Sequence, residues 1–286
     1  MKCLKGSKEG TADVRIIVTG GNSGVGKATA HAMAAAGHDV VIACRSLTKA
    51  HQAAASMPGD VAVRELDLAD LTSVRKFADT VDYVDVLVNN AGVLGLPLTR
   101  TADGFEAHMG INHLGHFALT CLLGGRIRDR VVAVASTNYS TARMHFDDLN
   151  YHRRRYNPWS AYGESKLANL LFVRELVARG TTAYASDPGM TDTGITRNGS
   201  GVLQWAGRVL SPHIAQSPSD GARSTIQAIT TTLPNGTYIA PRGLMHQWGK
   251  PKPTKLREKA RDADSARRLW NLSAELTCCE WQDGRP

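Results

Sequence analysis

Short runs of consecutive apolar residues alternate along the chain with longer segments in which apolar residues recur at helical spacing. The short runs are continuous rather than alternately apolar and polar, which is typical of strands buried on both faces of a parallel sheet. They predict about seven strands, at residues 14–20, 39–44, 60–66, 84–90, 130–136, 181–187 and 236–241.

The intervening segments predict helices, and this strand–helix–strand alternation builds a mostly parallel sheet with helices on both faces. No Pro/Ser-rich linker marks a boundary, so we predict a single doubly wound, Rossmann-type α/β domain over residues 1–286. Residues 1–13 are then an N-terminal tail and residues 250–286 a C-terminal extension. In such sheets ligands bind beyond the carboxyl ends of the strands. The helices are expected at about residues 27–37, 45–57, 71–80, 103–123, 158–179 and 219–232.

The composition is that of an ordinary globular protein, with 42% hydrophobic and 21% charged residues. The formal charge of +8 raises nucleic acid, an anionic membrane surface or an anionic ligand as partners. The basic runs at residues 152–156 and 249–262 are not interleaved with aromatic residues and follow no nucleic-acid-binding module. We interpret them as solvated surface, with dinucleotide phosphates as the alternative, and expect no nucleic-acid partner.

The five cysteines are scattered, odd in number and without metal-ligand spacing, which favours a reducing cytoplasm and predicts no metal site. The N-terminal segment contains no apolar core of the kind that a secretory signal needs. No run approaches about 18 consecutive apolar residues, the length of a membrane span. We therefore expect a cytoplasmic protein without a membrane anchor.

The first predicted strand ends in a glycine-rich turn, "TGGNSGVGK" at residues 19–27. Glycines let the backbone approach a pyrophosphate, and the following helix directs its free N–H groups at the phosphates. Any tight strand-to-helix corner also uses glycine, but the place between the first strand and a helix is the one that dinucleotide binding requires. The candidate binding residues are Thr19, Gly20, Asn22, Ser23, Gly24, Val25 and Gly26.

Arg45 ends the second predicted strand, where an NAD site usually carries an Asp or Glu for the ribose hydroxyls. A guanidinium can instead pair with the 2′-phosphate of NADP, so NADP(H) is predicted and NAD(H) is the less favoured cofactor. An ordinary solvated arginine is the other interpretation. Residues after the third and fourth strands would border the adenine and its ribose, although the same residue types are common in turns. They are Asp67, Leu68, Asn89, Ala91 and Gly92.

Tyr162 and Lys166 stand four residues apart in a predicted helix, so their side chains share one face. A nearby cation favours the phenolate and lowers the pKa of a tyrosine, although such pairs also occur by chance on helix surfaces. Ser136 ends the fifth predicted strand, where its hydroxyl either lies near Tyr162 or merely begins a turn.

These motifs and their order resemble the short-chain dehydrogenase/reductase family, and within it the retinol-dehydrogenase-like branch. The resemblance covers about residues 14–250 and rests on the glycine turn, "NNAG" (89–92), Asn112 in "GINHLGHF", Ser136, the Tyr162–Lys166 pair and "DPGMTDT" (187–193). Two positions depart from the family pattern without removing a catalytic group. Ala135 stands where many members have a second serine, and Asp187 where histidine is frequent.

The resemblance implies hydride transfer between a nicotinamide cofactor and a carbonyl or alcohol, with Tyr162 as the general acid or base. Lys166 would stabilise the phenolate and hold the nicotinamide ribose, and Ser136 would bind the substrate oxygen. Asn112 would hold a water that links Lys166 to solvent. The helices that carry Asn112 and Tyr162 would form the interface of a homodimer or homotetramer. The residues expected to border the nicotinamide or the diphosphate are Pro188, Gly189, Thr191 and Thr193.

Residues 194–218 combine glycines with apolar side chains, which suits a lid over a hydrophobic substrate, with a peripheral helix as the alternative. The predicted function is therefore NADP(H)-dependent oxidation or reduction of a lipophilic aldehyde, ketone or alcohol. Two other classes stay open. A non-catalytic NADP(H)-binding sensor need not keep Ser136, Tyr162 and Lys166 together, and a nucleic-acid-associated protein is suggested by charge alone.

Overall fold

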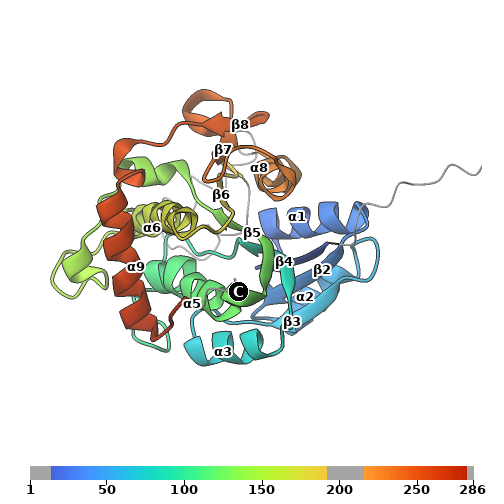
Figure 1. The fold of residues 1–286 in the computed structure, drawn as a ribbon, viewed down its shortest axis with the longest axis horizontal. Helices are drawn as coiled ribbons and strands as arrows, with labels where there is room; N and C mark the ends of the chain where they lie inside the picture. Colours follow the sequence, from blue (N-terminus) through green and yellow to red (C-terminus); the bar gives the residue numbers. More distant parts are fainter. Residues whose placement is uncertain (1–13, 192–215, 282–286) are drawn as a thin grey trace, which may run out of the picture.

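The computed structural model describes residues 14–191 and 216–281. Its strands form one sheet of eight, in the order β3-β2-β1-β4-β5-β6-β7-β8, with helices on both faces (Figure 1). This confirms the predicted doubly wound α/β fold. The predicted tail at residues 1–13, most of the predicted lid and Thr193 lie outside the described residues. The strands are β1 (Arg15–Thr19), β2 (Asp39–Cys44), β3 (Ala62–Glu65), β4 (Val84–Asn89), β5 (Ile127–Val134), β6 (Ala183–Ser186), β7 (Tyr238–Pro241) and β8 (Pro251–Thr254).

Strands β1 to β7 are parallel and correspond to the seven predicted runs, whereas β8 was not predicted. It pairs antiparallel with β7, with Pro251 opposite Pro241 and Pro253 opposite Ile239. Proline cannot donate to a sheet ladder, and it is tolerated on an edge strand such as this one. Because proline is rare in strands, the two prolines kept this segment from being predicted as a strand.

Seven helices of eight or more residues pack on the two faces of the sheet in the described part of the chain (Figure 1). One face carries α1 (Gly24–Ala35), α2 (Leu47–Ala54) and α8 (Pro218–Thr230). The other carries α3 (Leu71–Asp79), α5 (Gly115–Leu123), α6 (Pro158–Ala178) and α9 (Ala263–Thr277).

The helix predicted over residues 103–123 begins later and is interrupted. Glu106 caps a short helix α4 (Ala107–Met109), because its carboxylate accepts the N–H groups of His108 and Met109. A π-helical turn, Gly110–Leu114, then leads into α5. Such turns are rare and often occur at functional sites, and this one carries Asn112.

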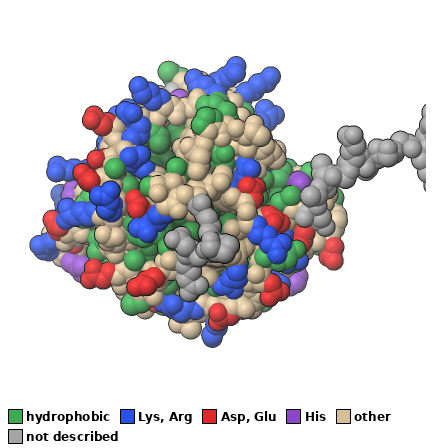
Figure 2. Space-filling model, viewed as in Figure 1, with side chains coloured by type: hydrophobic (Ala, Val, Ile, Leu, Met, Phe, Trp, Pro, Cys, Tyr) green, Lys and Arg blue, Asp and Glu red, His purple; other side chains and the backbone are tan. Residues whose placement is uncertain are grey.

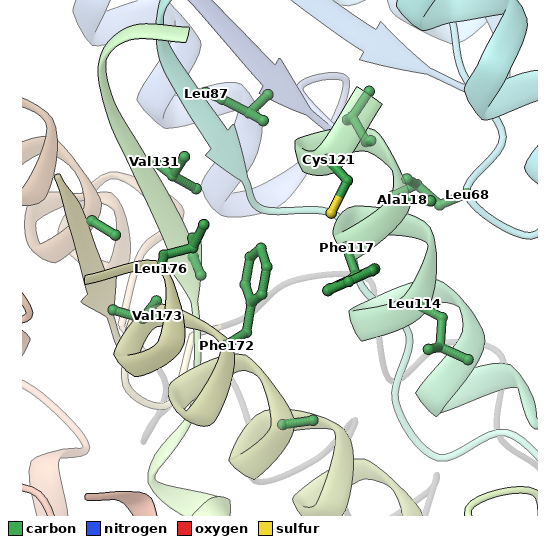
Figure 3. Packing of buried hydrophobic residues seen from close by; sticks show 14 of the residues in the cluster. Leu68, Leu87, Leu114, Phe117, Ala118, Cys121, Val131, Phe172, Val173 and Leu176 are labelled. Carbon is green, nitrogen blue, oxygen red and sulfur yellow. The ribbon is translucent and has the colours of Figure 1, made fainter. Parts of the chain in front are cut away.

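Aromatic side chains join α5, α6 and α9. Phe117 and Phe172 point toward one another between α5 and α6 (Figure 3), with ring centroids 5.8 Å apart. Trp270 of α9 lies 5.0 Å from the Phe117 ring and stacks on Phe172. The C-terminal helix therefore covers α6, which carries Tyr162, and α5, which directly follows the turn of Asn112.

On the face shown in Figure 2, Lys and Arg side chains are spread along the rim and interspersed with Asp and Glu. The basic runs are not solvated throughout, because Arg154 pairs with Asp148 and the buried Glu164, and Lys259 donates to the carbonyls of Ser140 and Ala142. In the described part of the chain, no helix combines the length and apolarity that crossing a bilayer requires.

Candidate active site

The glycine turn lies at the carboxyl end of β1, beside β4, where the order of the strands reverses. This is the crevice in which doubly wound sheets bind nucleotides. Gly20 and Gly24 adopt positive φ angles of 67° and 52°. A Cβ on Gly26 would lie 2.6 Å from the carbonyl oxygen of Gly20 and would also overlap the Asn90 amide, so only glycine fits at this position.

The first turn of α1 is suited to an anion. Its N-cap, Ser23, makes no side-chain capping bond, and the turn contains no acidic residue. The N–H groups there are therefore not claimed by a side-chain cap, and the positive end of the helix dipole faces the crevice. The turn thus fits a pyrophosphate, as the sequence pattern predicts.

Thr19 joins the glycine turn to β4. Its buried hydroxyl accepts the N–H groups of Asn90 and Ala91, at 2.9 and 3.0 Å. His116 lies 2.8 Å away through Nε2 and 3.1 Å from the Asn112 carbonyl through Nδ1. Because Nδ1 must donate to that carbonyl, Nε2 accepts from Thr19. The hydroxyl therefore shapes the turn, and its direct contact with a cofactor stays a prediction.

The predicted adenine-side residues lie along the same edge of the sheet. Arg45 is exposed directly after β2, and it forms no hydrogen bond or ion pair with any described residue. Asp67 accepts the N–H of Ala69 at 2.9 Å, so its carboxylate also shapes the turn after β3. Asn89 donates to Thr120 at 3.0 Å, while its buried Oδ1 has no partner among the described residues.

Ser136, Tyr162 and Lys166 meet at the carboxyl end of β5. The Ser136 hydroxyl lies near enough to Tyr162 to favour its phenolate form. Lys166 is buried, donates to the Val134 carbonyl at 2.9 Å, and places its Nζ 5.6 Å from the centre of the Tyr162 ring. Asn157 caps α6 by accepting the N–H groups of residues 159 and 160, which fixes the start of the helix that presents Tyr162.

Asn112 and Gly92 connect this cluster to the turn after β4. The Asn112 amide accepts the Val93 N–H at 2.8 Å and donates to the Ser165 hydroxyl at 2.9 Å. A Cβ on Gly92 would lie 3.2 Å from Asn112 Oδ1 and 3.6 Å from Lys166 Nζ. The structure thus brings Asn112 and Lys166 to the same glycine, while the water that Asn112 would hold stays a prediction.

Burial raises the pKa of Tyr162 to about 12; the hydrogen bond from Ser136 opposes this shift and the charge of Asp187 adds to it. Burial lowers the pKa of Lys166 to about 8, against the opposing effect of Asp187. The sequence predicted that Lys166 lowers the pKa of Tyr162. In the protein without cofactor the pKa of Tyr162 is instead raised, and burial is the largest cause.

The turn after β6 is held from two sides. Gly189 has a φ of 68°, and a Cβ there would press on the Gln247 carbonyl. Gln216 donates to the carbonyls of Pro188 and Gln247, at 3.2 and 3.0 Å, and Thr191 donates to Pro188 at 2.9 Å. The turn predicted to border the nicotinamide is therefore rigidly placed at the sheet edge.

Sequence reasoning missed a buried polar network beside Tyr162. His108 Nδ1 lies 2.8 Å from Glu106, and the Tyr156 hydroxyl lies 3.1 Å from the same carboxylate. The His108 ring stands edge-on to the Tyr162 ring, with centroids 6.3 Å apart. Burial would raise the pKa of Glu106, but the hydrogen bonds and charge of His108, together with the N–H of Met109, outweigh it and hold this pKa below its usual value. Two polar residues in "FEAHMG", just before Asn112, were the available signal.

Comparisons with known proteins agree with this arrangement. The pattern of the family described as short chain dehydrogenase matches residues 15–148. Retinol dehydrogenase 12 of Mus musculus is 40% identical, over 93% of this chain and 87% of the relative. Retinol dehydrogenase 13 of Homo sapiens is 38% identical, over 93% and 85%.

Two solved structures extend the comparison. An uncharacterized protein from Mycobacterium paratuberculosis matches with a TM-score of 0.80 and 42% identity, over 94% of this chain and 95% of that one. A short chain dehydrogenase from Burkholderia cenocepacia, in complex with NADP, matches with a TM-score of 0.60 and 26% identity, over 79% and 95%.

Proposed function

The chain belongs to the short-chain dehydrogenase/reductase family, and from this membership we propose that it transfers hydride between NADP(H) and a lipophilic aldehyde, ketone or alcohol. One observation carries the proposal: Ser136, Tyr162 and Lys166 lie together beyond the same sheet edge as the glycine turn. Similarity to the retinol dehydrogenases supports the lipophilic class of substrate.

The cofactor would be held by residues on the adjoining strand ends. The N–H groups that follow the glycine turn would bind the pyrophosphate, Arg45 the 2′-phosphate, and Lys166 the nicotinamide ribose. When bound, the nicotinamide supplies the hydride chemistry. The free guanidinium of Arg45 and the uncapped first turn of α1 support this assignment.

The protein groups would manage the proton. In carbonyl reduction Tyr162 donates its hydroxyl proton to the substrate oxygen, and the Ser136 hydroxyl stabilises the charge that develops there. In alcohol oxidation the Tyr162 phenolate takes that proton back. A pKa of about 12 keeps Tyr162 protonated near neutral pH, which supports the role of proton donor.

A fluorescence titration of the purified protein with NADPH and, in parallel, NADH tests the proposal. We expect NADPH to bind at least about tenfold more tightly, a difference of ~1.4 kcal/mol. A screen of lipophilic aldehydes and ketones should then show NADPH-dependent turnover. Binding without turnover would favour the sensor, and a folded protein that binds neither nucleotide would refute the proposal.

Replacing Arg45 by Asp is expected to weaken NADPH binding by about tenfold or more while NADH affinity changes little, because only NADPH carries the 2′-phosphate. The exposed Arg267 of α9 offers a control, since Arg267→Asp changes the net charge equally at a distant surface. An NADPH-to-NADH affinity ratio that is the same in both variants would mean that Arg45 does not read the phosphate.

We retain a homodimer or homotetramer and a cytoplasmic location as parts of this proposal. The resemblance puts the subunit interface on the helices of Asn112 and Tyr162, yet α9 packs on both of them through Trp270. Helix α9 therefore covers part of the surface that this interface would need. A monomer mass measured by light scattering would refute the proposed homodimer or homotetramer.

A further inference from the structure

Asp187 follows β6 with a side chain that is only 1% exposed. Its carboxylate accepts three hydrogen bonds, from the Thr137 hydroxyl at 2.7 Å, the Tyr238 hydroxyl at 2.6 Å and the Gly189 N–H at 2.8 Å. All three donors are neutral, and Asp187 forms no ion pair with a described residue. A buried charge with neutral partners is costly to keep and acts strongly on its surroundings.

The three donors belong to different parts of the candidate site. Thr137 directly follows Ser136, which lies near Tyr162. Gly189 lies in the turn predicted to border the nicotinamide, and Tyr238 stands on β7. The carboxylate therefore ties the end of β5 to the turn after β6.

Asp187 is also the main source of negative charge for the Tyr162–Lys166 pair. Its charge raises the pKa values of both groups. Around the pair, His116 lies near Lys166, His108 borders the Tyr162 ring, and Glu106 is paired with that histidine. Tyr238 donates to Asp187 itself, and Tyr139 packs edge-on against Tyr238.

We propose that Asp187 is a positioning residue for the proposed reaction: it fixes the Ser136 segment against the Pro188–Gly189 turn through its hydrogen bonds to Thr137 and Gly189, and it sets a buried carboxylate beside the Tyr162–Lys166 pair. The inference rests on the proposed function. Reduction consumes the Tyr162 proton and oxidation needs the phenolate. Asp187 therefore extends carbonyl reduction into alkaline pH and delays alcohol oxidation to higher pH.

The test compares the pH dependence of kcat/KM in three variants. Asp187→Asn keeps the volume and can still accept the Gly189 N–H, but it removes the charge. We expect the alkaline limb of reduction, and the rising limb of oxidation, to move down by about one pH unit. Thr137→Val and Tyr238→Phe each remove one hydrogen bond to Asp187 and leave its charge. The limbs of their pH profiles should therefore stay at the wild-type pH or move to higher pH.

A second readout needs no substrate: the ionisation of Tyr162, followed by phenolate absorbance as the difference between each protein and its Tyr162→Phe counterpart. It should show the same downward shift for Asp187→Asn. If that variant does not fold, Asp187→Ser provides the same comparison. A titration unchanged by loss of the charge, or an equal downward shift in Thr137→Val and Tyr238→Phe, would overturn the inference.

The two readouts separate this inference from the function on which it rests. Wild-type protein that reduces no carbonyl would refute the proposed function, while the absorbance titration would still decide the role of Asp187. Wild-type turnover with both readouts unshifted in Asp187→Asn would refute the inference alone.

Discussion

Replacing Tyr162 by Phe is expected to lower kcat/KM for carbonyl reduction by about 10²–10⁴-fold, the range that a positioned general acid contributes. The substitution removes one hydroxyl and leaves the ring, which keeps its edge contact with His108. The nucleotide residues at the glycine turn and Arg45 are untouched. NADPH affinity, measured by fluorescence, should therefore stay within about twofold, so the loss appears in turnover and not in binding.

A matched control removes a tyrosine hydroxyl elsewhere on the sheet. The Tyr184 hydroxyl donates to the Leu233 carbonyl at 2.8 Å, and its ring packs on the opposite face of the sheet from α6. Tyr184→Phe should keep wild-type turnover within about twofold, because no reacting group is removed. Normal turnover in Tyr162→Phe would exclude Tyr162 from the mechanism. Equal loss of turnover and NADPH binding would show that the substitution disturbs the whole site.

The fold could be predicted because strands buried on both faces read as unbroken apolar runs. That rule recovers β1 to β7 and fails for β8, whose two prolines break the pattern at an exposed edge. Helix α9 did leave a signal, since Ala266, Leu269 and Trp270 recur at helical spacing and are buried. It directly follows the basic run at residues 249–262, and no helix was predicted there.

The site could be predicted in part because its groups sit at strand ends or four residues apart on one helix. The same reasoning could not find the contact of Tyr156 with Glu106, since these residues lie 50 positions apart and meet only through the fold. The spacing of Tyr162 and Lys166 also predicted a lowered pKa for Tyr162, whereas burial raises it. A spacing shows which charges are near, but the cost of burial depends on how completely the surrounding elements exclude water.

Acid is expected to destabilise the folded protein well before its carboxylates titrate, because two histidines are buried as neutral groups. Burial, with the charge of neighbouring His116, lowers the pKa of His113 to about 3. Burial also lowers the pKa of His116 to about 4. In the unfolded chain both titrate near ~6.5. The His113 ring lies 2.9 Å from Ser273 of α9, and His116 accepts from Thr19, so neither has room for a proton and its hydration.

The direction in which the free energy of unfolding changes with pH follows from proton uptake by the unfolded chain. Above about pH 7.5 both states are unprotonated and the histidines add no pH dependence. As the pH falls through ~6.5, the unfolded chain binds protons that the folded protein excludes, so the free energy of unfolding decreases. Between about pH 7.5 and 5 each histidine should remove about 2 kcal/mol, at 1.36 kcal/mol for each unit below the unfolded pKa. The two sites are coupled, so their sum is an upper bound.

Urea denaturation at several pH values between about 7.5 and 5 measures this loss. His113→Asn removes one of the two groups and should reduce the pH slope of the unfolding free energy by about half, even if it lowers stability at every pH. The exposed His31 supplies the control, since His31→Asn should keep the wild-type slope. A stability that is flat from pH 7.5 to 5 would mean that His113 and His116 accept protons in the folded state. The Thr19 hydroxyl could not then donate to His116 Nε2, so the hydrogen bonding of the turn after β1 would have to change.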